Sequence, residues 1–461
     1  VLPKVELADV PASLPELEFR EHRQDGLCLT SYGQGTNGLV YQQTVAPLPA
    51  MPADQLALLP YYTNVLTELG LGDSDYLETQ HRQSATVGSI NAFTSMRGEV
   101  NNEQAITANL VLSSKALLRN SDEQTALMID TLHNLRFNEH ARIRDMISHQ
   151  RARREQSVTG NGHGLAMAAA CAGMSPLAQL NHELSGLAGI RTVRRLDESI
   201  RDDASLADLA TQLESLHSAI TAMPVQLLAV AEPDQLDAVA TAALKGWSAM
   251  GAGKDGEPWR PAAMREARNE LWVTNTQVNF CARAYPTVPV GHPDAAVLTV
   301  LGAFLRNGYL HRAIREQGGA YGGGASQDSG IASFRFYSYR DPRLWETLDD
   351  FDASIEWLRE ESLDQQQLEE AILGIVGSLD KPSSPAGEAK QHFHNRLFGR
   401  THDQREVFRQ QVLSVGKEDL RRVAETYLTA EKASTAVITS AAQRDADSGR
   451  IEEQRLSVEE L

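Results

Sequence analysis

Apolar and polar residues alternate along several short segments in the first half of the chain, which is the pattern of half-buried strands. Such strands are predicted at residues 17–20, 26–30, 38–45, 87–94, 105–112 and 225–230. Helical spacing predicts a helix from about Ala53 to Leu69, which Gly70 ends, and a mainly helical stretch from about Asp122 to His217. A further helix that reaches about Trp247 completes this first unit.

The same order of elements begins again after residues 251–261, where glycine, proline and charged residues predict a linker. Strands are expected near Leu271 and Val278, within 320–339 and at 436–439, with helices over 294–317 and from the third strand region to about Tyr427. Five apolar residues fall on one face of a helix and should pack it against its sheet: Leu344, Leu348, Phe351, Ile355 and Leu358.

The two units also match in detail, because Asn120-Ser-Asp and Arg340-Asp-Pro each follow a strand and precede a helix. We therefore predict an α+β fold with two homologous domains, each an antiparallel-rich sheet packed with helices. The predicted boundaries are a linker at 1–15, a first domain at 16–250, the linker at 251–261, a second domain at 262–445 and a charged C-terminal tail at 446–461.

Composition narrows the partners and the compartment. Of the 461 residues 42% are hydrophobic, and the formal net charge of −18 argues against a nucleic-acid or anionic-membrane partner. No apolar run is long enough to span a bilayer, so we expect a soluble protein. Cys28, Cys171 and Cys281 are widely spaced, which favours a reducing compartment, the cytoplasm by default with an organelle as the alternative. The chain lacks an initiator Met and has a proline-rich start, so we expect a piece of a longer chain.

The most distinctive local pattern is a helix end at residues 310–317 that runs into a glycine-rich turn and a strand. Arg315 and Tyr321 stand six residues apart and flank Gly318 and Gly319. A guanidinium and a phenol can both donate hydrogen bonds to the negative charge that develops on a peptide carbonyl during hydrolysis. The alternative is structural, with Arg315 at the negative end of a helix and Tyr321 packed at a sheet edge.

This Arg–Tyr block resembles the C-terminal half of the insulinase/pitrilysin superfamily of zinc metallopeptidases, the inverzincins. The segments 336–342 and 371–377 are similar to its presequence-protease branch in particular. The resemblance implies that Arg315, Tyr321, Gly318 and Gly319 bind substrate, and that the substrates are unstructured peptides. It also implies an N-terminal, zinc-bearing half as partner, on the same chain or in trans.

The zinc motif itself, His-x-x-Glu-His, does not occur in this sequence. Tyr61, Asn64 and Val65 stand where the resemblance would place its ligands and its glutamate. Two other histidine pairs have unsuitable spacing for a metal site: His133 with His140, and His392 with His394. We therefore expect no metal and no cofactor in this chain, zinc in the complete enzyme, and no peptidase activity from this chain alone. Two rivals remain: a separate non-catalytic subunit, and a structural or peptide-binding protein of the same fold.

Overall fold

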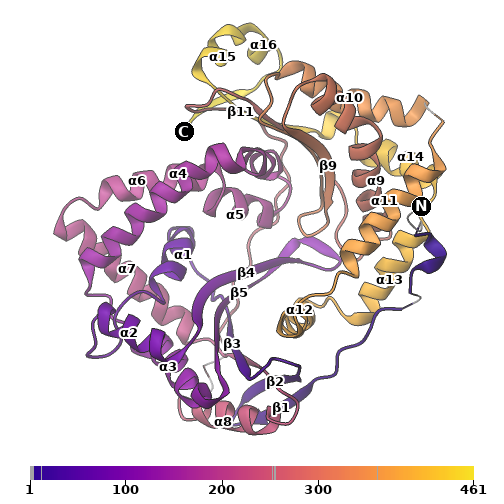
Figure 1. The fold of residues 1–461 in the computed structure, drawn as a ribbon. Coiled ribbons are helices and arrows are strands. Elements are labelled where there is room, and N and C mark those ends of the chain that lie inside the picture. Colours follow the sequence, from indigo (N-terminus) through magenta and orange to yellow (C-terminus); the bar gives the residue numbers. More distant parts are fainter. Residues whose placement is uncertain (1–4, 12, 252, 254–255, 361) are drawn as a thin grey trace.

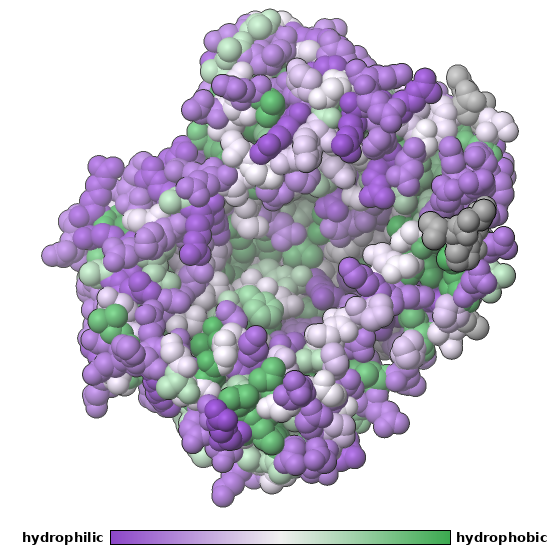
Figure 2. Space-filling view, viewed as in Figure 1, coloured by the Kyte–Doolittle hydropathy of each residue, from purple (hydrophilic) through white to green (hydrophobic). Residues whose placement is uncertain are grey.

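The computed structural model describes residues 5–11, 13–251, 253, 256–360 and 362–461. Two six-stranded sheets, each packed with helices, form two halves arranged around a central hollow (Figure 1). The predicted α+β class is therefore confirmed. The space-filling view shows hydrophobic residues along the floor of this hollow and mainly hydrophilic ones around its rim (Figure 2).

The first sheet has the strand order β1-β2-β6-β3-β5-β4. Its neighbours pair antiparallel except β2 with β6, and the long β4–β5 hairpin shifts register between Gly98 and Glu99. The strands are β1 (Arg20–Gln24), β2 (Leu27–Gly33), β3 (Leu39–Pro47), β4 (Ser89–Glu99), β5 (Asn102–Leu117) and β6 (Gln226–Ala231). The predicted strand at 17–20 is wrong by several residues, since only Arg20 of it lies in β1.

Helices of the first half include one that the sequence pattern did not predict, α2 (Tyr76–Thr86), whose first turn is capped by Asp75. The helix predicted to reach Leu69 ends at Val65. The remaining helices are α1 (Ala53–Val65), α3 (Ser121–His133), α4 (His140–Cys171), α5 (Pro176–Leu184), α6 (Leu187–Ser199), α7 (Asp203–Thr221) and α8 (Leu236–Ser248).

The second sheet has the order β12-β7-β11-β8-β10-β9, with β7 parallel to both β11 and β12. Its strands are β7 (Asn269–Val273), β8 (Phe280–Pro286), β9 (Gly322–Asp328), β10 (Ser333–Tyr339), β11 (Ser434–Thr439) and β12 (Ser457–Glu460). Its helices are α9 (Asp294–Leu305), η3 (Arg306–Gln317), α10 (Trp345–Glu360), α11 (Gln365–Leu379), α12 (Pro385–Leu397), α13 (His402–Leu413), α14 (Lys417–Tyr427), α15 (Ala441–Ala446) and α16 (Ser448–Glu453).

The C-terminal segment is part of this sheet, which differs from the charged tail expected at 446–461. Strand β12 pairs with β7, and the Leu461 N–H donates to the Val273 carbonyl at 3.0 Å. Two ion pairs fix the segment further, Arg191–Glu459 and Arg444–Glu460, both at 2.6 Å. The charges that suggested a tail are therefore those of an edge strand.

Each sheet is covered on one face by helices of its own half and on the other face by a helix of the opposite half. Side chains that alternate along β8 and β11, such as Phe280 and Ile438, face α4, whereas Cys281 and Val437 belong to the core beneath α9, α10 and α14. Conversely, Phe393 and its neighbours on α12 pack on Tyr32 and other residues of the first sheet. The five residues predicted to share one helix face are all buried on α10 or just before it.

Candidate functional site

The Arg–Gly–Gly–Tyr segment lies where η3 ends and the edge strand β9 begins. Helix η3 continues α9 with π-type hydrogen bonding and stops at Gly319, whose φ of 79° is in the left-handed region that favours glycine. The Gly319 N–H donates to the Arg315 carbonyl, and the Ala320 N–H donates to the Ile314 carbonyl, both at 3.1 Å. This closed turn fixes the chain on either side of it, at Arg315 and at Tyr321.

Gly318 is required by packing. A Cβ atom at this position would lie 1.9 Å from Nη2 of Arg343 and 2.6 Å from the Ile314 carbonyl oxygen. Arg343 is itself held in place by Asp350 at 2.8 Å. Both paired glycines thus have local structural reasons, and their role in admitting a substrate strand stays a prediction.

Tyr321 stands on the surface, with 67% of its area exposed. Its N–H donates to the Tyr339 carbonyl at 3.0 Å, and its ring meets the Tyr339 ring edge-on at a centroid distance of 5.5 Å. Behind this pair, the His163 ring contacts Tyr339 at 4.7 Å and Phe280 contacts it at 5.9 Å. The exposed phenol is therefore supported by an aromatic cluster that joins both halves of the molecule.

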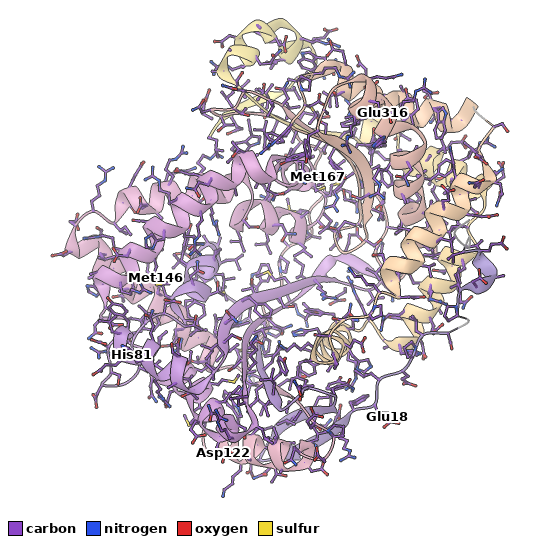
Figure 3. The ribbon with its side chains drawn as sticks, viewed as in Figure 1. Glu18, His81, Asp122, Met146, Met167 and Glu316 are labelled. Carbon is purple, nitrogen blue, oxygen red and sulfur yellow. The ribbon has the colours of Figure 1, made fainter. Side chains whose placement is uncertain are left out.

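Arg315 is also exposed, and its guanidinium has no ion-pair partner among the residues that the structure describes. The Tyr321 hydroxyl likewise has no hydrogen-bond partner within the described part of the chain. Figure 3 labels Glu316, the neighbour of Arg315, on the second half, and Met167 on α4. The segment thus presents two strong donors that the fold itself does not use.

Strand β9 offers a free edge beside these donors. It is the last strand of its sheet and pairs only with β10, so its outer backbone groups can accept another strand. Gly322 has open space where a side chain would stand, whereas Gly323 lies against Ile314 and Gly324 against Arg306. A peptide in extended form could add to this edge next to Tyr321.

A kink in α4 supports the site and was missed in the sequence. Asn161 has non-helical angles of φ −131° and ψ 27°, and nearby carbonyls accept hydrogen bonds from the second half. The Tyr339 hydroxyl donates to the Gly160 carbonyl at 3.4 Å, and Arg340 Nη2 donates to the Thr159 carbonyl at 3.5 Å. The run Gly160-Asn-Gly-His-Gly164, unusual inside a helix, is the signal that could have revealed it.

The place of the absent zinc motif does not suit a metal ion. Tyr61 and Val65 are buried in the core, and the Asn64 amide donates to Gln150 Oε1 at 2.8 Å. A phenol, an amide and an alkyl side chain are a poor donor set for zinc. Within the described ranges, no three His, Cys, Asp or Glu side chains gather as a metal site would require.

The histidine pairs that were considered as ligands have structural surroundings. Glu139, beside His140, accepts hydrogen bonds from the N–H groups of Gly70 and Tyr76. On α12, His392 Nδ1 lies 2.8 Å from the Tyr32 hydroxyl, and His394 Nε2 lies 2.8 Å from Gln43 Oε1. These two histidines therefore tie α12 to the first sheet.

Comparison with known proteins places this geometry in a class. One family model, which describes a region associated with subfamily C of the M16 peptidases, matches residues 1–196, and a second, PreP C-terminal domain, matches residues 269–443. A protease from Helicobacter pylori has the same fold, with a TM-score of 0.66 and 13% identity over 92% of this chain and 99% of that one. An M16 peptidase inactive domain from Pseudomonas fluorescens aligns with a TM-score of 0.65 and 15% identity, over 92% and 98% of the two chains.

The chain therefore belongs to the M16 peptidases. Within them it is homologous to the C-terminal half of presequence protease, as its similarity to the curated proteins indicates. The mitochondrial presequence protease of Danio rerio is 27% identical over 93% of this chain, and that of Yarrowia lipolytica is 29% identical over 93%. The chain spans 43% of the length of each of these relatives. Among the described helices, none is long and apolar enough to cross a membrane.

Proposed function

We propose that this chain is the C-terminal, non-zinc half of a zinc metalloendopeptidase that degrades unstructured peptides. The observation that carries the proposal is the pair of free donors, Arg315 and Tyr321, beside the open edge of β9. An extended peptide would add to that edge through its backbone, and the two donors would bind its carbonyl oxygens. The same half would form part of the wall that encloses the peptide.

The two side chains act on charge. A carbonyl oxygen gains negative charge when water attacks the peptide bond, so donors fixed near it stabilise the transition state more than the ground state. Zinc, held by the other half, would activate that water. Arg315 keeps its charge at any physiological pH, and Tyr321 is held by the Tyr339 ring, so both are preorganised for this role.

For the compartment we propose a reducing one. Cys28, Cys171 and Cys281 are all free thiols, and burial raises the pKa of Cys171 to about 11. The relatives from Danio rerio and Yarrowia lipolytica are named mitochondrial, and one from Arabidopsis thaliana is named chloroplastic and mitochondrial. These names favour an organelle over the cytoplasm that the sequence suggested by default.

The proposal is tested by complementation. The chain is assayed for zinc and for cleavage of an unstructured basic peptide, first alone and then mixed with a zinc-bearing N-terminal half. We expect no turnover from this chain alone and turnover after mixing. Stoichiometric zinc together with activity in the isolated chain would overturn the proposal.

Within the complemented enzyme, Tyr321→Phe should lower kcat on the order of 10²-fold, because one donor to the developing charge is lost. Steady-state kinetics measures the effect, and circular dichroism checks the fold. Tyr309→Phe is the matched control, since Tyr309 lies on the same π-helix, packs on Trp357 and is not part of the proposed site. An unchanged kcat for Tyr321→Phe would remove this residue from the mechanism.

A second candidate is a separate, non-catalytic subunit that pairs in trans with a zinc subunit. It is favoured by the Helicobacter pylori and Pseudomonas fluorescens chains, which this chain covers almost completely, whereas it covers less than half of the curated relatives. Size-exclusion chromatography with a separately expressed zinc subunit distinguishes the two arrangements. A stable complex of two natural chains supports pairing in trans.

A further inference from the structure

A cleft of about 520 Å³ opens between the two halves, away from Arg315 and Tyr321. Its walls come from Arg97 at the end of β4, the turn between β9 and β10, helix α12, and helix α13 with the loop before it. Neither the predicted peptide-binding segment nor any motif singled out in the sequence contributes to it. Its lining is unlike the rest of this acidic molecule.

The cleft is lined by five arginines and a single carboxylate. The arginines are Arg97, Arg335, Arg400, Arg405 and Arg409. Asp328, the carboxylate, pairs with Arg335 at 3.2 Å, and Asp380, just outside the lining, pairs with Arg409 at 2.8 Å. For a chain with a net charge of −18, this is a strong local concentration of positive charge.

Three of these guanidinium groups have no carboxylate partner in the described part of the chain: Arg97, Arg400 and Arg405. Arg97 Nη1 donates to the Asn395 amide oxygen at 3.3 Å, and its guanidinium also lies over the Phe398 ring at 4.9 Å. Glu406 is on the same helix as Arg405 but is engaged with the Leu14 N–H. Positive charge in the cleft is therefore only partly balanced.

Buried donor atoms in the cleft also lack hydrogen-bond partners. Arg409 is the clearest case, because its side chain is only 1% exposed and its Nη1 has no partner among the described residues. The Nε atoms of Arg335 and Arg400 are in the same situation. A buried donor without an acceptor is costly, so a fold that keeps three of them around one cleft has an acceptor to gain.

Electrostatics point the same way. Burial lowers the pKa of the Arg400 guanidinium, and the nearby charge of Arg97 lowers it further, while Asp328 only partly offsets this. Burial likewise lowers the pKa of Arg97. An anion between these two groups would remove their mutual repulsion and supply acceptors for the free N–H donors.

We propose that this cleft binds an oxyanion of the phosphate class, such as inorganic phosphate, pyrophosphate or a small phosphorylated molecule. The planar fork of arginine matches phosphate oxygens in bidentate geometry. Three unbalanced guanidinium groups favour a multiply charged group over a single carboxylate. Because Arg97 belongs to the first half and Arg400 to the second, the bound anion also joins the two halves.

The test is isothermal titration calorimetry of the 461-residue chain with sodium pyrophosphate, at constant ionic strength, together with thermal melting. We expect saturable binding and a pyrophosphate-dependent rise in Tm. Acetate and succinate at the same concentrations should bind much more weakly. Arg400→Gln should weaken pyrophosphate binding on the order of tenfold or more. It should also leave the Tm without anion unchanged or higher, because it removes an unbalanced buried charge.

Arg119→Gln is the matched control, since it removes the same charge from an exposed site on the first half. It should leave binding unchanged within the error of the measurement. Arg97→Lys, which retains the charge but not the fork, should bind at reduced affinity and shows whether geometry matters beyond charge. Equal binding of succinate and pyrophosphate, or wild-type affinity in a folded Arg400→Gln variant, would overturn the proposal.

Discussion

Two buried histidines differ in how their ring nitrogens are satisfied. His217 Nδ1 lies 3.0 Å from the Tyr62 hydroxyl, whereas His182 packs edge-on against Trp272 and its Nδ1 has no partner among the described residues. Burial lowers the pKa of both rings to about 4. Both histidines are therefore neutral in the folded protein at neutral pH.

This gives a prediction for acid stability. In the unfolded chain each ring takes up a proton near pH 6.5, but in the folded chain only near pH 4, so the unfolded state binds more protons between these values. The free energy of unfolding should thus be fully present above about pH 6.5 and fall as the pH is lowered to 4, by up to about 3 kcal/mol per histidine. Urea unfolding across this range measures it.

His182→Phe should flatten this decrease, because the ring packing on Trp272 is kept and the titrating group is removed. His81→Phe is the control, since His81 is exposed on α2 (Figure 3), and it should leave the slope with pH as in the wild type. An equally steep decrease in the His182→Phe variant would show that other groups dominate the acid response.

At the same scale, the sequence predicted side chains whose role depends on local pattern. Leu348 and Phe351 were expected on one buried helix face and are buried. His163 and Asn161 were not identified, because their importance comes from Tyr339, which is distant in the chain. Arg400 was missed for the same reason, since the cleft exists only once the two halves are packed together.

Among the elements, α4 has the widest reach. It begins in the first half and runs beneath β8, β10 and β11 of the second sheet (Figure 1). Gly162 allows this close approach, because a Cβ atom there would lie 2.6 Å from the Phe280 ring. A larger residue would separate the helix from the sheet.

Gly162→Ala should therefore destabilise the protein by about 1–3 kcal/mol, the usual cost of overpacking a well-filled core. Gly160→Ala is a sharp control two residues away, because nothing lies within 4 Å of its added Cβ atom. We expect that change to be neutral or to stabilise by about 0.5–1 kcal/mol, since alanine favours a helix. Denaturant unfolding compares the two, and a Gly162→Ala variant as stable as Gly160→Ala would contradict the packing described for α4.

The order of strands and helices could be predicted well, because hydrophobic periodicity is a local property. What failed were the features that depend on pairing across the chain. Strand β12 looked like a charged tail because its exposed glutamates conceal its backbone pairing with β7. Helix α2 has a short, mostly polar sequence with one buried residue, Thr79, and so gave no apolar stripe to recognise.

For the whole molecule, the exchange of helices between the halves has an energetic consequence. Helix α4 fills one face of the second sheet, and α12 fills one face of the first. Neither half can bury its apolar surface without the other. We therefore expect a single cooperative unfolding transition in calorimetry.

Phe393→Ala tests this coupling. The side chain is 2% exposed, belongs to α12 of the second half and packs on the first sheet, so its loss should destabilise by about 3–5 kcal/mol. Hydrogen exchange should speed up together in β6 of the first half and β8 of the second. Val407→Ala, at an exposed position of α13, should change stability by less than about 0.5 kcal/mol. Faster exchange confined to one half would indicate independent folding units.

The kink of α4 at Asn161 limits how this protein can be divided by an engineer. The carbonyls of Thr159 and Gly160 accept hydrogen bonds from Arg340 and Tyr339 of the second half, and Tyr339 in turn supports Tyr321. A fragment that starts after the linker would retain Tyr321 in its sequence and lose the backbone that positions it. The smallest fragment worth expressing for binding studies therefore begins well upstream, before α4.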